Sequence, residues 1–166
     1  MAMIGLFWIT DESVYVGSPP NADGHCVRLT PEGVAASGPD GDRAWTWSSL
    51  RSAVVKGAPV RGRSGGAGRY LAAVVEAVVT MASGFGEGPP EMLLGLETAD
   101  GTQELPVSAA ARGYTAEEIA LSQVLLARFL EGTADPRTLT GWSRHHGGTT
   151  PKPPGREALL REWTRS

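Results

Sequence analysis

Two adjacent residues, His25 and Cys26, are of the types that combine a thiolate nucleophile with an imidazole base. That chemistry needs the two side chains within hydrogen-bonding distance of each other. The residues that follow favour a strand, and neighbouring side chains on a strand point to opposite faces. We therefore interpret Cys26 as a small buried residue rather than as a nucleophile.

A second pair, His145 and His146, is of a type that binds metal ions. The two histidines lack the i, i+4 spacing that places ligands on one helix face, and no carboxylate lies near them in sequence. Ser48 and Ser49 lack the Gly-x-Ser-x-Gly context of a serine nucleophile. We therefore assign no catalytic residue, no metal site and no cofactor, and we expect a protein that is not an enzyme.

Positive charge gathers in residues 43–75, a stretch that contains no acidic residue. Arg61, Arg63 and Arg69 lie in and around the Gly-rich segment 62–68 and are candidates to bind a phosphate or an acidic peptide. The alternative, which we favour, is a solvated loop that balances acidic neighbours. The segment is not a Walker A motif, because no Gly-Lys-Ser or Gly-Lys-Thr follows it.

Composition sets wider limits on the function. The chain has 166 residues, 15 basic and 18 acidic side chains and a net charge of −3, which argues against nucleic-acid binding. Its single cysteine excludes an intramolecular disulfide and a cysteine-cluster zinc site. The longest apolar run, 70–81, falls short of the roughly 20 residues that span a membrane. With no recognisable secretory signal, we expect a soluble cytoplasmic protein.

The first half of the chain predicts short strands. Residues 4–10 and 13–17 flank a two-residue turn, which is the pattern of a β-hairpin. Trp45 and Trp47 alternate along one expected strand; they are of a type that stacks on bases or peptides, but we favour positions in the core. The further strands expected here cover 26–30, 34–37, 43–47 and 50–56.

The second half predicts helices around one hairpin. Residues 69–83 lack glycine and proline and favour a buried helix, with an interfacial membrane helix as the alternative. Residues 92–98 and 103–107 predict a hairpin. Residues 136–166 are expected to form a Gly/Pro-rich tail in which 156–163 makes a short final helix.

The strongest single element is a helix expected at 115–131. Thr115 and Glu118 form a capping box at its start, and Gly132 supplies its end. Large apolar side chains recur at i, i+4 and form a wide apolar arc. They are Leu121, Leu125, Leu126, Phe129 and Leu130. This helix must therefore cover an apolar surface.

The order of these elements resembles bacterial pleckstrin-homology-like (PH-like) domains across residues 4–131. The resemblance is carried by IGLFWIT and SVYVG, LTPEGVAAS, the step Trp47-Ser48-Ser49-Leu50, and LLGLETADGTQEL followed by the 115–131 helix. It implies a mainly β fold of the α+β class: a barrel of two antiparallel sheets, capped by helix 115–131, with an extra helix near 69–83. It also implies a binding module for lipids, peptides or proteins, with no catalytic residue to carry over.

These observations lead to one expected function and one alternative. We expect a PH-like domain at 1–135, followed by the tail at 136–166. Its expected function is that of a non-enzymatic interaction module that binds a protein or peptide partner or a second copy of itself. The alternative is a peripheral membrane module that binds anionic lipid through the basic stretch 51–69.

Overall fold

The computed structural model describes residues 2–20, 24–39, 41–60, 91–111 and 113–165. Their strands are β1 (Ala2–Ile4), β2 (Phe7–Ile9), β3 (Val14–Val16), β4 (Cys26–Leu29), β5 (Gly33–Ser37), β6 (Arg43–Thr46), β7 (Leu50–Lys56), β8 (Glu91–Thr98) and β9 (Gly101–Ser108). Their helices are η1 (Trp47–Ser49), α2 (Ala116–Glu131), α3 (Pro136–His146) and α4 (Pro153–Arg165). The helix expected at 69–83, and Arg61, Arg63 and Arg69, lie outside the described residues.

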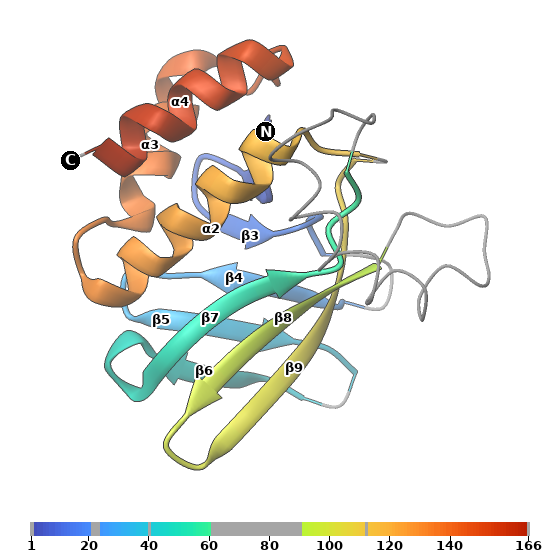
Figure 1. The fold of residues 1–166 in the computed structure, drawn as a ribbon, viewed down its shortest axis with the longest axis vertical. Coiled ribbons are helices and arrows are strands. Elements are labelled where there is room, and N and C mark those ends of the chain that lie inside the picture. The colour runs from blue at the N-terminus through green and yellow to red at the C-terminus, as the bar shows by residue number, and fades with distance from the viewer. Residues whose placement is uncertain (1, 21–23, 40, 61–90, 112, 166) are drawn as a thin grey trace.

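The described strands form two antiparallel sheets (Figure 1). Strands β1 to β6 pair in chain order, and β7, β8 and β9 form the second sheet. The mainly β, α+β class expected from the sequence is confirmed. The expected closed barrel is wrong, because no strand pairing among the described residues joins the two sheets.

The edge of β7 gives a physical reason for this open arrangement. The backbone N–H of Val55 donates to Oε1 of Gln123 at 3.0 Å, and the Val55 carbonyl accepts from Nε2 of the same side chain. A side chain of α2 thus takes the position of a neighbouring strand. It satisfies the backbone groups that an edge strand would otherwise leave unpaired.

Replacing Gln123 with leucine should lower the free energy of unfolding by about 1–3 kcal/mol, because the Val55 N–H and carbonyl lose their partners. Urea denaturation of both proteins measures this difference. Val124→Ala on the same helix is the control, since Val124 is 47% exposed. Equal unfolding midpoints for Gln123→Leu and wild type would contradict the role assigned to this amide.

The N-terminal apolar run folds differently from its expectation. Residues 4–10 were expected as one strand, but a turn at Gly5 and Leu6 divides them between β1 and β2. Gly5 has a φ of +58°, and a Cβ there would overlap Oγ of Ser122, so glycine is required. The Leu6 N–H donates to the same oxygen at 3.0 Å, which ties the turn to α2. Strands β2 and β3 then form the predicted hairpin.

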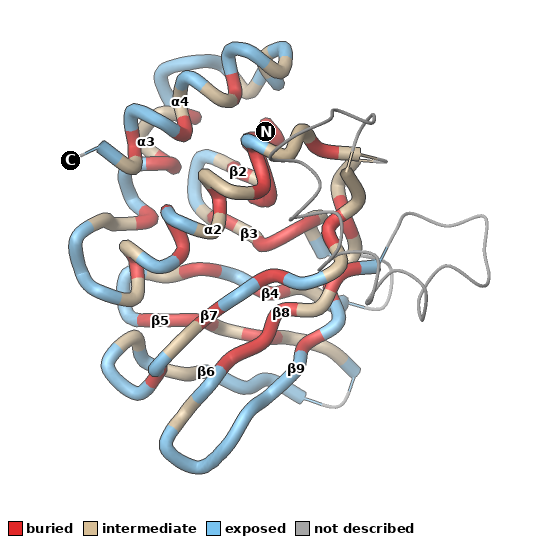
Figure 2. The backbone as a smooth tube through the Cα atoms, in the orientation of Figure 1, coloured by how far each residue is buried: buried red, intermediate tan, exposed pale blue. Residues whose placement is uncertain are grey.

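The apolar core lies between the two sheets and beneath α2 (Figure 2). The predicted capping box of Thr115 and Glu118 is present at the start of α2, and Gly132 ends the helix in the left-handed conformation. The helix predicted at 115–131 is therefore confirmed. Its buried apolar side chains are Ile119, Leu125, Leu126 and Phe129.

Two helices occupy the segment expected to be a tail. Asp135 caps α3 by accepting from the Arg137 N–H, and Pro136 occupies its first turn. The expected terminal helix is present as α4, which is longer than 156–163 and lies along α2 (Figure 1). Among the described residues, no helix is long and apolar enough to cross a membrane.

Candidate functional site

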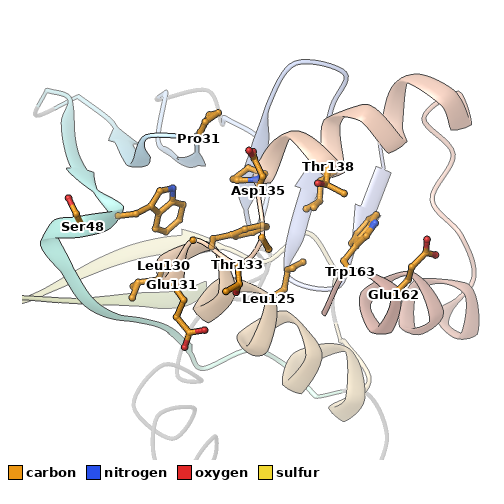
Figure 3. A pocket seen from close by; sticks show the side chains of 16 residues that line it. Pro31, Ser48, Leu125, Leu130, Glu131, Thr133, Asp135, Thr138, Glu162 and Trp163 are labelled. Carbon is orange, nitrogen blue, oxygen red and sulfur yellow. The ribbon is translucent and has the colours of Figure 1, made fainter. Parts of the chain in front are cut away.

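An open cavity of about 880 Å³ lies where η1, α2, α3 and α4 meet (Figure 3). We call this cavity the helical groove. One wall comes from the end of α2 and the loop that follows it, and the others come from η1 with Pro31, from the start of α3 and from the end of α4. Its lining residues are Pro31, Trp47, Ser48, Leu125, Phe129, Leu130, Glu131, Gly132, Thr133, Ala134, Asp135, Pro136, Thr138, Leu139, Glu162 and Trp163.

The floor of the helical groove is apolar. Leu125 and Phe129 are four residues apart on α2, so both face the same way. They are buried together with Leu139 of α3 and Trp163 of α4. Because these floor side chains are already covered, the apolar surface that a ligand could remove from water comes from the half-buried Trp47, Leu130 and Ala134.

Trp47 forms a wall of the groove. Its indole N–H donates to the Thr30 carbonyl at 3.0 Å, and its ring centroid lies 6.1 Å from that of Phe129. The expected strand 43–47 ends one residue early, so Trp47 belongs to η1 and does not alternate with Trp45. Both tryptophans are half-buried and pack against the core.

The rim of the groove carries three carboxylates. Glu131 ends α2, Asp135 precedes α3, and Glu162 belongs to α4, so they stand on different sides of the cavity (Figure 3). None of the lining residues is lysine, arginine or histidine. Hydrogen bonds from the Arg137 side chain lower the pKa of the Asp135 carboxyl, so Asp135 is ionised at neutral pH and paired with Arg137. Glu131 and Glu162 are exposed.

The described cations of residues 43–60 do not line the groove. Lys56 pairs with Glu104 of β9 across 3.5 Å. Arg43 donates to Gln103 at 3.4 Å, and its guanidinium carbon lies 5.5 Å from the Trp45 ring centroid. These two cations therefore make local contacts within the β structure.

The histidine and cysteine candidates are also placed apart from the groove. His25 is exposed and Cys26 is half-buried, and both line a separate cavity of about 430 Å³ beside β9. His145 and His146 lie in the last turn of α3, where each Nδ1 contacts the backbone oxygen four residues earlier. Within the described ranges, no three His, Cys, Asp or Glu side chains are grouped to hold a metal ion.

The groove was not predicted from the sequence, because its walls come from four separate segments and none carries a motif of its own. The one local signal was Asp135-Pro136, the start of α3. Comparisons with protein-family models, with curated proteins and with solved structures found no match for this chain. The groove itself is therefore the basis for assigning a function.

Proposed function

We propose that this protein is a non-enzymatic interaction module that binds a peptide segment of a partner protein in the helical groove. The observation that carries the proposal is an open cavity of about 880 Å³ in which the half-buried apolar side chains of Trp47, Leu130 and Ala134 lie over the buried core. Cavities of roughly 300–1,000 Å³ are typical of binding sites. This one has room for a few peptide side chains.

The distribution of polar groups supports binding rather than catalysis. The charged side chains stand at the rim, while the floor consists of leucine, phenylalanine and tryptophan. An apolar centre with a polar rim is the usual anatomy of a protein interface. The resemblance to PH-like domains, whose members bind lipids, peptides or proteins, agrees with this role.

The elements around the groove are suited to hold a bound segment in one geometry. The Trp47 side chain is fixed by its hydrogen bond to Thr30. Trp163 is held by edge-to-face contact with Trp142, with ring centroids 5.9 Å apart. Aromatic side chains fixed in this way lose little conformational entropy on binding, so more of the contact free energy appears as affinity.

Selection of short random peptides on the immobilised full-length protein tests the proposal. Thr138 is exposed at the groove, and Thr138→Trp should fill it. We expect the selected peptides to bind Thr138→Trp at least tenfold more weakly, a loss of about 1.4 kcal/mol. Thr102→Trp, at an exposed position on β9, is the matched control and should bind as wild type does.

Two results would overturn the proposal. One is a failure to select any peptide, and the other is a set of peptides whose affinity Thr138→Trp leaves unchanged. Vesicles that contain phosphatidylserine provide a further arm of the experiment. Salt-sensitive binding to these vesicles, without any peptide binding, would favour the anionic-lipid alternative through the basic stretch 51–69.

A further inference from the structure

We infer that the segment bound in the helical groove is basic and amphipathic, with lysine or arginine side chains flanking its apolar anchors. This inference rests on the proposed function and adds the chemistry of the partner. It follows from the charge of the rim, from the end of α2 and from the way α2 already holds α4.

The rim has negative charge on three sides. Glu131, Asp135 and Glu162 come from different elements, so a bound segment that leaves the cavity over the end of α2, the start of α3 or the end of α4 passes near a carboxylate. Arg137 already pairs with Asp135 across 2.7 Å. Recognition of an incoming cation therefore falls mainly to Glu131 and Glu162, and an acidic segment would meet like charge.

The backbone adds to this negative potential. Leu130, Glu131 and Gly132 at the end of α2 line the groove, and a helix C-terminus carries a partial negative charge. The start of α3, which carries the opposite partial charge, lies nearby. There the Asp135 side chain accepts from the Arg137 N–H at 2.8 Å and offsets that charge.

Helix α2 already binds an amphipathic helix through two arginine side chains elsewhere on its surface. In α4, Leu160 and Trp163 are buried, while Arg156 and Arg161 form ion pairs with the carboxylates of Glu118 and Glu117 on α2.

The helical groove repeats that combination towards the other end of α2. Half-buried Leu130 and Trp47 supply the apolar part and Glu131 supplies the charge. Trp163 contributes to both surfaces, since it belongs to α4 and lines the groove. A basic amphipathic segment from a partner would thus meet the same chemistry that holds α4.

The peptides selected in the preceding experiment also test the charge of the partner. We expect them to be enriched in lysine and arginine beside leucine or aromatic residues. Replacing their basic residues with glutamine should weaken binding about tenfold, and so should raising the ionic strength from about 50 to 500 mM.

A double variant of the protein provides the reciprocal measurement. Glu131→Gln combined with Glu162→Gln should weaken the binding of the basic peptides several-fold and leave the affinity for their glutamine versions unchanged. Glu91→Gln combined with Glu97→Gln, both at exposed positions on β8, is the matched control and should change neither affinity.

The outcomes separate this inference from the function on which it rests. If the selected peptides were neutral or acidic, and bound Thr138→Trp more weakly than wild type, the inference would be overturned and the interaction function would stand. Equal affinities for the basic peptides and their glutamine versions would do the same. Peptides insensitive to Thr138→Trp, or no peptides at all, would overturn both.

Discussion

Replacing Phe129 with alanine should destabilise the protein by about 3–5 kcal/mol. Phe129 is only 1% exposed, and its ring lies 6.2 Å from that of Phe7 and 6.1 Å from that of Trp47, centroid to centroid. The side chain thus joins α2 to the six-stranded sheet and to η1. Alanine would leave a cavity that this surrounding structure can only partly fill.

Thermal and urea denaturation measure the effect of Phe129→Ala. For a chain of this size each kcal/mol corresponds to roughly 2–4 °C in Tm. Val124→Ala, on the exposed face of the same helix, should shift the curve far less. A soluble Phe129→Ala protein with an unshifted melting curve would contradict the position of Phe129 in the core.

Replacing Arg156 with alanine should cost a similar amount, about 3–5 kcal/mol, because it leaves a buried carboxylate without its cation. Glu118 has no exposed surface and Arg156 is 7% exposed. The Glu118 carboxylate accepts from the Arg156 guanidinium and from the Thr115 N–H of the capping box. The Glu118 side chain therefore caps the first turn of α2 and also binds α4 through Arg156.

Arg161→Ala is the matched control for Arg156→Ala. Arg161 lies on the same helix, but its side chain is 45% exposed and so is that of its partner Glu117. Exposed pairs contribute about 0–1 kcal/mol. Urea denaturation compares the two variants. Equal losses in the free energy of unfolding would show that burial does not increase the contribution of the Arg156 pair to stability.

A double variant distinguishes the loss of the ion pair from the loss of packing. Glu118→Gln removes the carboxylate that a substitution of Arg156 leaves unpaired, and glutamine can still complete the capping box. The combination of Glu118→Gln with Arg156→Leu should therefore be more stable than Arg156→Ala alone. A double variant that is less stable would mean that the Arg156 ion pair is not what limits stability.

Elements with a local signal were predictable from the sequence. The capping box and the apolar arc predicted α2, and the two runs rich in strand-forming residues on either side of a two-residue turn predicted the β2–β3 hairpin. Helix α3 was missed because it is largely polar and depends on distant partners. Its Ser143 donates to Oδ1 of Asp11 at 2.9 Å, and its Arg144 donates to the Asp11 carbonyl at 2.9 Å.

The open sheet arrangement and the groove depend on contacts of the same long-range kind. Nothing adjacent to Gln123 in the sequence shows that its amide will replace a strand beside Val55. Likewise, Trp47 and Trp163 meet in one cavity although most of the chain separates them. Local patterns predict elements well, whereas a site between elements becomes visible only once they are packed.

The most direct test of the groove as a binding site is an NMR titration of the isotope-labelled protein with a selected basic peptide. The backbone signals of residues 47–48, 125–139 and 162–163 should shift together as the peptide is added, while those of β8 and β9 stay in place. Shifts confined to residues 51–69 or to β8 and β9, with the groove signals unmoved, would contradict it.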